Sequence, residues 1–330
     1  MGQEPLRASI AETYNRTFHL DDGSVEGLPR GLAAENVVVC TGAAEGLSLL
    51  FKCFASGKTV GLPHGHWENY ENGVQMAGGR TVIVDYFDAS GALDVVGIER
   101  AIRENELAVL VANFPCNPTG AVLDDEEARA LARVVRETGV VLIADEVYAR
   151  LRYDGLPAIS LLRYAPGHAV SVSSASKEYL LPGARVGYVV SARSAVTDRV
   201  LRKVLRASTA SANVLGQERL QAIMDRDLED LRHGREASFI ARVREVMRGR
   251  RDRLVEVLGK HGFAMVGRAG RAPQGTIFLM AALPAWWSGT DTELASTALE
   301  AGVMSAIPGA AFGLPGAIRC LLYTSPSPRD

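Results

Sequence analysis

The sequence has few cysteines and no excess of either charge. Its four cysteines, in 330 residues, show no C-x-x-C spacing, and most of them lie in apolar runs. Such thiols are typical of buried side chains in a reducing compartment, so we expect a cytoplasmic protein. Lysine and arginine number 36 against 38 aspartate and glutamate residues, a net charge of −2. This balance disfavours nucleic acid and anionic membranes as partners and favours small neutral or zwitterionic molecules.

Long hydrophobic runs are also missing. No stretch approaches the roughly 20 apolar residues that a membrane-spanning helix needs, and residues 1–14 lack a basic segment followed by an apolar one. We therefore expect neither a membrane anchor nor a signal peptide. With 47% hydrophobic and 22% charged residues, the chain can bury a large core. Its length favours one large unit and a smaller one.

Short apolar runs rich in β-branched residues alternate with helical patterns in the first half of the chain. The runs are NVVVC, RTVIVDYF, LAVLVANF and VVLIAD, at residues 36–40, 80–87, 107–114 and 140–145. This alternation predicts a parallel sheet covered by helices on both faces. Ligands of such sheets bind at the carboxyl ends of the strands. Candidate site residues therefore lie at 41–44, 113–120, 145–148 and 174–177.

The second half of the chain has a different pattern. Residues 211–261 are mainly helical in pattern and charged, which predicts a long connecting helix. Beyond it, TIFLMAAL at 276–283 predicts a strand, TELASTALEAG at 292–302 a helix, and VMSAIPGAAFG at 303–313 a strand and a loop. This second unit is too small to fold alone, so we expect it to pack on the first.

Lys177 stands between two apolar runs, in the segment SSASKEYLLPGARVGY. A lone lysine after a strand is usually a solvated surface residue. At a strand end that faces a partly desolvated crevice, however, an ammonium group loses its proton more easily, and the neutral amine can form a Schiff base. Amines of this kind commonly hold pyridoxal phosphate, so the other residues that this cofactor needs can be searched for.

Two further strand ends fit that cofactor. Asp145 ends the buried run VVLIAD, where an ionised carboxylate is costly without a cation. A protonated pyridine nitrogen would supply the cation; the alternative is that Asp145 only caps the following turn. At 40–47, CTGAAEGL turns from a strand into a helix, so the backbone N–H groups of Ala43 and Ala44 can bind an anion. Alone, that turn is a weak signal.

Three segments carry a family resemblance. NFPCNPTG at 113–120, ADEVY at 144–148 and SASKEYLLPGARVG at 174–187 resemble the class I/II aminotransferases of the fold-type I pyridoxal phosphate family. The third segment matches the family's lysine signature throughout. The similarity runs in the family's order from PLRASIA at 5–11 to Arg319.

The resemblance implies a fold and an assembly. It predicts a large domain over residues 1–245, with a mostly parallel, seven-stranded sheet, and a small, incomplete α/β domain over residues 246–319. Family members usually begin several dozen residues earlier, with an arm that contacts a second subunit, and the intact protein is expected to be a homodimer. Residues 320–330, CLLYTSPSPRD, resemble a translated sequencing-adapter read. We therefore expect a non-native tail and a chain truncated at both ends.

The resemblance also implies roles around the ring of the cofactor. Lys177 would form the Schiff base and move a proton between the substrate α-carbon and the cofactor. Asp145 would keep the ring nitrogen protonated, and Tyr148 and Asn117 would hydrogen-bond the phenolate oxygen. Trp67 would stack on the ring, and plain packing in the core is almost as good an explanation of this residue.

The remaining roles concern two anionic groups. The cofactor phosphate would be bound by Ala43, Ala44, Ser174 and Arg185. Members of the family often have a hydroxyl residue where Ala44 stands, so one hydrogen bond to the phosphate is in question. Arg319, assisted by Asn117, would bind the substrate α-carboxylate, which matches the planar guanidinium group.

The function implied is an aminotransferase that moves an amino group from an L-amino acid to a 2-oxo acid by a ping-pong mechanism. A carbon–sulfur β-lyase on the same fold stays open, because the same carbanion can expel a β leaving group. An inactive fragment that only holds the cofactor stays open as well. The motifs do not identify the amino donor.

Three other segments are interpreted as having no functional site. HGH at 64–66 has two imidazoles and no visible third ligand, which disfavours a metal site. RGRRDR at 248–253 is expected to be a solvated helix face. GRAGRAPQG at 267–275 lacks the G-x-G-x-x-G spacing of a nicotinamide site.

Overall fold

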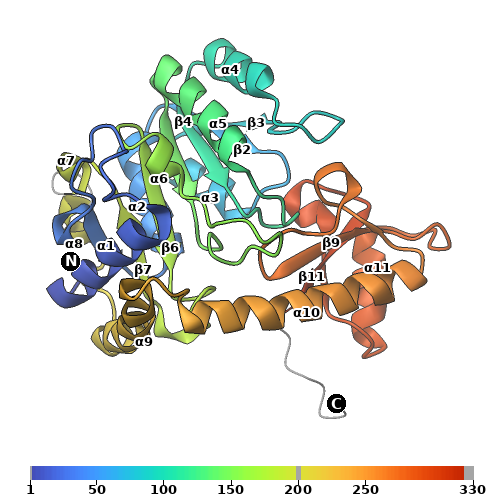
Figure 1. The fold of residues 1–330 in the computed structure, drawn as a ribbon. Helices are drawn as coiled ribbons and strands as arrows, with labels where there is room; N and C mark the ends of the chain where they lie inside the picture. Colours follow the sequence, from blue (N-terminus) through green and yellow to red (C-terminus); the bar gives the residue numbers. More distant parts are fainter. Residues whose placement is uncertain (1, 198–201, 323–330) are drawn as a thin grey trace.

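The computed structural model describes residues 2–197 and 202–322. Figure 1 shows a large domain, in which a sheet is covered by helices, and a small domain at the far end of one long helix, α10 (Ser238–Lys260). In the described parts of the chain, no helix is both long and apolar enough to cross a membrane. The second unit packs on the first, as the sequence predicts.

The large domain is built on a seven-stranded sheet with the strand order β1-β7-β6-β5-β4-β2-β3. Its strands are β1 (Val37–Cys40), β2 (Thr59–Pro63), β3 (Arg80–Val84), β4 (Leu107–Asn113), β5 (Val141–Asp145), β6 (Ala169–Ser174) and β7 (Gly187–Val190). The pairings are parallel except those of β7, which runs antiparallel to both β1 and β6. The prediction of a mostly parallel, seven-stranded sheet is confirmed.

Helices cover both faces of this sheet. One face packs against α1 (Glu4–Phe18), α4 (Val95–Glu104), α5 (Asp125–Thr138), α6 (Leu161–Tyr164) and α9 (Val214–Arg232). The other face packs against α2 (Ala43–Phe54), α3 (Asn69–Met76), α7 (Ser194–Val196) and α8 (Arg202–Ser208). Successive residues of a strand point to opposite faces, so Leu110 lies in the first core while Val109 and Val111 lie in the second.

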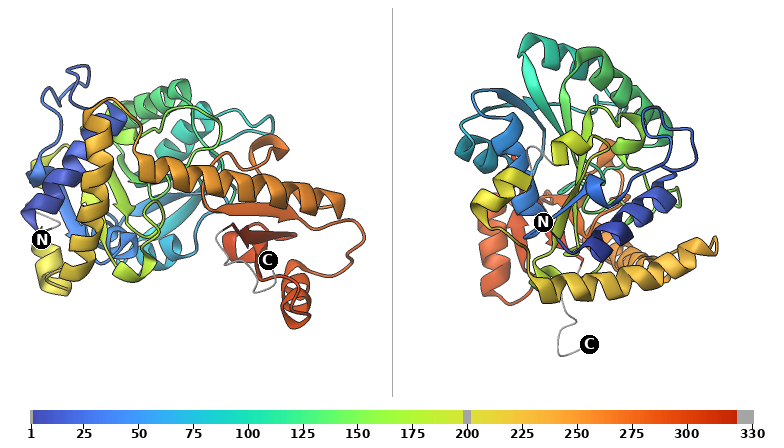
Figure 2. Two further views of the ribbon diagram at one scale, coloured as in Figure 1. Left: turned by 60° about the horizontal axis from the view of Figure 1, so that its bottom comes forward. Right: turned by 90° about the vertical axis from the view of Figure 1, so that its left-hand side faces the viewer.

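The connection between the domains differs from the prediction of one long helix over 211–261, which is wrong. Two helices occupy this segment, α9 and α10, and the left view of Figure 2 shows them running in different directions. The chain turns at Gly234, whose φ of +68° is unfavourable for residues with a side chain. Asp227 and Asp230 then accept hydrogen bonds from the backbone N–H groups of Phe239 and Ser238, which cap the start of α10.

The small domain contains a four-stranded antiparallel sheet in the order β10-β11-β9-β8. Its strands are β8 (Ala264–Met265), β9 (Phe278–Ala282), β10 (Ala306–Pro308) and β11 (Ala317–Leu321), and its helix is α11 (Asp291–Glu300). The predicted strand at 276–283 and helix at 292–302 are thereby confirmed. The segment 303–313 forms the short strand β10 followed by a 3-10 helix, Gly309–Phe312.

The predicted domain limits, at residues 245 and 319, can be compared with the structure. Residue 245 lies inside α10, which continues without a break, so the division there stays a prediction. At the other limit, β11 continues past Arg319, Cys320 pairs with Ala306, and the backbone N–H of Leu322 donates to Ile277. Residues 320–322 therefore belong to the small domain, which corrects the expectation that the fold stops at Arg319. Residues 323–330 lie outside the described residues, so a non-native tail stays a prediction.

Candidate active site

A cavity of about 300 Å³ opens between the carboxyl edge of the large sheet and the small domain. All ten residues singled out in the sequence line it, which are Ala43, Ala44, Trp67, Asn117, Asp145, Tyr148, Ser174, Lys177, Arg185 and Arg319. They come from strand ends, loops and helix starts that lie far apart in the sequence. The parallel sheet brings them together because the strands that carry them end at one edge.

Lys177 lies in the turn that follows β6. The turn is fixed locally, because the backbone N–H of Ser176 donates to the hydroxyl of Ser174 at 3.3 Å. The ammonium nitrogen of Lys177 lies 5.7 Å from the ring centroid of Phe278. Burial lowers the pKa of Lys177, and the positive charge of Arg319 lowers it further. Both effects increase the fraction of neutral, nucleophilic amine.

Asp145 is the last residue of β5 and is almost fully buried. Burial raises the pKa of this carboxyl to about 6, against the opposing effect of a hydrogen bond from Tyr70. The hydroxyl of Tyr70 donates to Oδ2 at 2.5 Å, while the turn-capping bond, from the backbone N–H of Val147 to Oδ1, is longer at 3.4 Å. Capping is thus the weaker of the two contacts. The ionised carboxylate would gain much from a cation placed in the cavity.

Tyr70 is a residue that the sequence reasoning missed. It lies on α3, is 1% exposed, and its ring meets that of Trp67 edge to face at 5.7 Å. Its pKa is raised, first by burial and then by the negative charge of Asp145, so the hydroxyl stays protonated and donates. Trp67 itself lines the cavity and also packs on the core, so packing is confirmed while stacking on a cofactor ring stays a prediction. No local signal in the sequence marks Tyr70, because Trp67 lies before α3 and the bond to Asp145 joins residues 75 positions apart.

Arg319 reaches the cavity from β11 of the small domain. Its guanidinium carbon lies 4.0 Å from the ring centroid of Phe278 and 4.3 Å from that of Phe312, so two aromatic rings hold the group. One guanidinium nitrogen donates to Oδ1 of Asn117 at 3.0 Å. Nε is buried without a hydrogen-bond partner in the part of the chain that the structure describes. The guanidinium group of Arg319 therefore still has N–H donors for a carboxylate.

Tyr148 and Asn117 also line the cavity. The ring of Tyr148 meets that of Phe278 edge to face at 5.9 Å, and burial raises the pKa of its hydroxyl. Asn113 fixes the loop of Asn117, because its side-chain oxygen accepts from the backbone N–H of Asn117 at 2.8 Å. The side-chain nitrogen of Asn113 donates to the backbone oxygen of Asp145 at 2.9 Å, which ties the two strand ends together.

The start of α2 forms a cradle for an anion. Gly42 precedes the helix with a φ of +82°, and the backbones of Gly42 and Ala43 lie so close to Gly187 that a Cβ at Gly187 would collide with them. Arg185 lies against Gly42, which has no side chain to displace it, and also donates to the carbonyl of Pro182 at 3.1 Å. A helix N-terminus beside a guanidinium group suits a phosphate.

This set of donors fits pyridoxal phosphate. The cavity offers a buried acid for a ring nitrogen, a lysine with a lowered pKa for an aldehyde, and the anion cradle of α2 for a phosphate. Within residues 2–197 and 202–322, no cluster of three His, Cys, Asp or Glu side chains could hold a metal ion. In the HGH segment, His64 contacts Asp85 and His66 contacts the carbonyl of Pro63.

The other two segments that were set aside lie away from this cavity. Arg248, Arg250 and Arg253 are exposed on α10, as expected for a solvated helix face. In the segment 267–275, a 3-10 helix spans Arg268–Gly270, and the side chain of Arg268 donates to the carbonyl of Val122 at 3.2 Å. Neither segment contributes a residue to the cavity.

Comparison with known proteins identifies the family of the chain. Residues 18–327 match the family Aminotransferase class I and II. The chain is 31% identical over 322 residues to a probable aspartate/prephenate aminotransferase of Thermus aquaticus, which covers 96% of this chain and 76% of that protein. It is 27% identical over 334 residues to an aspartate aminotransferase of Bacillus subtilis, covering 98% of this chain and 78% of that one.

Solved structures show the same fold. The aspartate aminotransferase of Thermus thermophilus with maleate superimposes with a TM-score of 0.84 at 30% identity, over 98% of this chain and 78% of that chain. An N-succinyldiaminopimelate aminotransferase of Mycobacterium tuberculosis gives a TM-score of 0.83 at 27% identity, over 97% and 79% of the two chains. The chain therefore belongs to the class I and II aminotransferases, a family of pyridoxal-phosphate-dependent enzymes of fold type I.

Proposed function

We propose that this chain uses pyridoxal phosphate to move an amino group from an L-amino acid to a 2-oxo acid, with Lys177 as the Schiff-base residue. One observation carries the proposal: Lys177, Asp145 and Arg319 come from two adjacent strand ends and from the small domain, and all three line one cavity. Relatives named aspartate or aspartate/prephenate aminotransferases support amino acids and oxo acids as the substrates. When bound, the cofactor supplies an electron sink next to the substrate α-carbon.

Each part of the cofactor has residues suited to hold it. The carboxylate of Asp145 would pair with the protonated ring nitrogen, which gives this buried acid the cation it lacks. Tyr148 and Asn117 would hydrogen-bond the phenolate oxygen, and Trp67 would cover one face of the ring. The phosphate would be bound by the backbone of Ala43 and Ala44 and by the side chains of Ser174 and Arg185.

Lys177 has two tasks in this proposal. Its nitrogen would hold the cofactor at its aldehyde group, for which the amine must be neutral, and burial lowers its pKa in that direction. Once the amino group of the substrate has replaced Lys177 on the cofactor, the lysine nitrogen would be free to take the proton from the substrate α-carbon. The ring of Phe278 lies beside it, so the amine works in a partly desolvated space.

Arg319 and Asn117 would orient the substrate. The guanidinium group would bind the α-carboxylate with two parallel hydrogen bonds, and the ring pair of Phe278 and Phe312 keeps it from swinging away. Asn117 links the loop after β4 to Arg319 and so fixes the position of the carboxylate relative to the strand ends. Correct orientation of the α-carbon bond is what proton removal requires.

The decisive test is a covalent one. The purified chain would be mixed with pyridoxal phosphate, its visible absorption recorded, the Schiff base reduced with borohydride, and the label located by peptide mass mapping. We expect the label on Lys177, and none on this peptide in Lys177→Ala. Lys52→Ala is the matched control, because Lys52 is an exposed lysine on α2, outside the cavity. A label spread over surface lysines would contradict the proposal.

Turnover distinguishes the outcomes that share this cofactor. Transfer to 2-oxoglutarate from an amino acid would support the aminotransferase. Release of pyruvate and ammonia with no oxo acid present would indicate the carbon–sulfur β-lyase, and cofactor binding without either reaction an inactive fragment. Sedimentation of the loaded chain tests the further proposal that it acts as a homodimer.

A further inference from the structure

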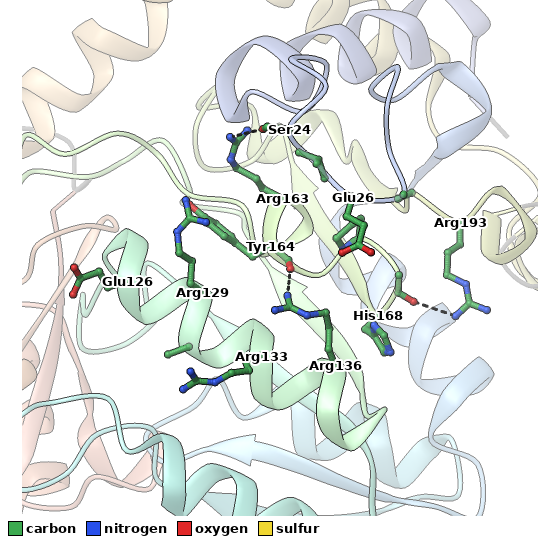
Figure 3. Close-up of a pocket in the computed structure, with 16 residues that line it drawn as sticks. Ser24, Glu26, Glu126, Arg129, Arg133, Arg136, Arg163, Tyr164, His168 and Arg193 are labelled. Carbon is green, nitrogen blue, oxygen red and sulfur yellow. Dashed lines mark hydrogen bonds between the residues drawn. The ribbon is translucent and has the colours of Figure 1, made fainter.

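A second and larger cavity lies at the opposite edge of the large sheet. It has a volume of about 920 Å³, and its walls are α5, the loop at 24–27, the connection from α6 to β6, and the residues that follow β7. β7 is antiparallel to β6, so its carboxyl end lies at the amino edge of the parallel strands. Figure 3 shows the side chains of this cavity.

The lining of this cavity has more cationic than acidic side chains. Five arginines contribute to it, which are Arg129, Arg133, Arg136, Arg163 and Arg193. The lining also includes His168, and its acidic residues are Glu26 and Glu126. The first three arginines stand on α5 with spacings of four and three residues, which places them on one face of that helix.

Most of these guanidinium groups contact neutral carbonyls. Arg136 donates to the backbone oxygen of Tyr164 at 2.5 Å, and Arg193 donates to that of Gly167 at 3.3 Å. Such bonds position an arginine without neutralising its charge. Each guanidinium group has five N–H donors, so these bonds leave donors free.

Four carboxylates lie near the five arginines, which are Glu26 and Glu126 in the lining and Asp125 and Asp22 beside it, so they balance most of the positive charge. Arg129 pairs with Asp125 at 2.6 Å, and Arg163 has a long contact with Asp22 at 3.4 Å. Arg133 has no partner within the residues that the structure describes. The cavity therefore keeps an uncompensated positive charge, although the chain as a whole carries a net charge of −2. A concave wall with an excess of one sign of charge concentrates ions of the opposite sign.

We propose that this cavity binds a small polyanion that carries two or more phosphate groups. The guanidinium fork matches phosphate oxygens, and the arginines come from α5, α6 and the segment after β7, so a ligand must present several anionic groups to reach them together. The volume lies within the range of about 300–1,000 Å³ that is usual for small-molecule sites.

This site is separate from the proposed active site and does not depend on its function. β5 and β6 join the two cavities, because their carboxyl ends carry Asp145 and Ser174 while His168 stands just before β6. β5 has five residues, so about 13 Å separates its ends. A bound polyanion would hold the loop at 24–27, α5 and the start of β6 together, away from the anion cradle of α2.

The test measures binding of inorganic tripolyphosphate by calorimetry. The chain is first saturated with pyridoxal phosphate, so that the cradle at α2 is filled. We expect one saturable site, with an affinity that falls as KCl is raised. Arg133→Gln removes a guanidinium group that holds no other residue, so we expect binding to weaken about tenfold. Arg100→Gln, an exposed arginine on α4 outside the cavity, is the matched control and should bind as the native chain does.

A second variant should change the affinity for tripolyphosphate in the opposite direction. Glu26 is an exposed acid in the lining, so Glu26→Gln should tighten tripolyphosphate binding by a few fold, which general damage to the fold would not do. The absence of saturable binding would overturn the proposal. So would equal affinity in native chain, Arg133→Gln and Glu26→Gln, or retention of RNA without binding of tripolyphosphate.

Discussion

The two edges of the large sheet use charge in opposite ways. At the carboxyl edge, Asp145 and Tyr148 are each 3% exposed, and burial shifts the pKa values of Asp145 and Lys177 toward each other. At the amino edge, Arg133 and Arg136 stand exposed on α5. Desolvation can tune a proton transfer, whereas exposed guanidinium groups keep a fixed charge that attracts anions and is screened by salt. The same strands thus carry the proposed active site at their carboxyl edge and the proposed polyanion site at their amino edge.

Replacement of Asp145 should have the largest effect. In Asp145→Asn the side chain cannot carry a negative charge for the ring nitrogen, so we expect turnover to fall about a thousandfold. In the native chain the carboxyl becomes neutral below its pKa of about 6, so cofactor affinity should drop there as pH falls. Steady-state kinetics measure the turnover, and fluorescence titration of the cofactor from low to neutral pH measures its affinity. A variant with native turnover would refute the assigned role.

Arg319→Lys should come next. It keeps a positive charge but loses the planar fork that binds a carboxylate with two bonds. We expect the amino acid concentration at half saturation to rise about a hundredfold, with the cofactor spectrum unchanged. Steady-state kinetics on the variant provide the measurement, and the native spectrum serves as the control for the fold. Unchanged half saturation would remove Arg319 from the substrate site.

Tyr70→Phe should have a smaller effect, about tenfold. The hydroxyl of Tyr70 lowers the pKa of Asp145, so its loss should move that pKa further above 6, by about 1.4 kcal/mol or one pH unit. The acid limb of cofactor binding would then shift upward in pH. Tyr86→Phe is the matched control, since Tyr86 is a buried tyrosine whose hydroxyl donates to the backbone of Val111. An equal shift in both variants would contradict the contact's role.

Glu146 should affect the free energy of unfolding, and this effect can be measured without the cofactor. This carboxyl is buried beside Asp145 and accepts from Ser160, Leu161 and Ser171, and burial raises its pKa from 4.5 to about 7. Because the folded pKa is the higher one, its stabilisation is full below pH 4.5 and is lost as pH rises through 7.

The variant Glu146→Gln isolates that contribution. Other buried acids add their own pH dependence to the native curve, but the difference between native and variant contains only the effect of this residue. We expect the native chain to lose about 3 kcal/mol relative to Glu146→Gln between about pH 4.5 and pH 7. Denaturant unfolding at several pH values measures it, and parallel curves would show that Glu146 titrates normally in the fold.

Features that depend on neighbouring residues could be predicted from the sequence. The end of an apolar run places Asp145 and Lys177 at strand ends, and parallel strands end at one edge, so these residues meet in one cavity. The small unit was recognised for the same reason, because alternating strands and helices leave local patterns. The roles of the cavity residues are predictions that the experiments above test.

Features that depend on contacts between distant residues could not be predicted from the sequence. Tyr70 is buried against Asp145 from 75 positions away, and no local pattern distinguishes it from a core tyrosine. Phe278 meets Arg319 only because β9 and β11 pair. The break at Gly234 did have a local signal, a glycine in a charged helical segment, but only the caps from Asp227 and Asp230 fix where the next helix begins.

The uninterrupted helix α10 acts as a lever. It has 23 residues and is about 34 Å long, and the small domain packs along its second half, where Arg250 donates to the carbonyl of Leu322 just beyond β11. A rotation of about 5° at its first turn would displace Arg250, about 18 Å along the helix, by about 1.6 Å, roughly half a hydrogen-bond length. A shift of that size would change the hydrogen bond from Arg319 to Asn117, so this contact depends on the angle at which the chain leaves Gly234, 85 residues before the arginine.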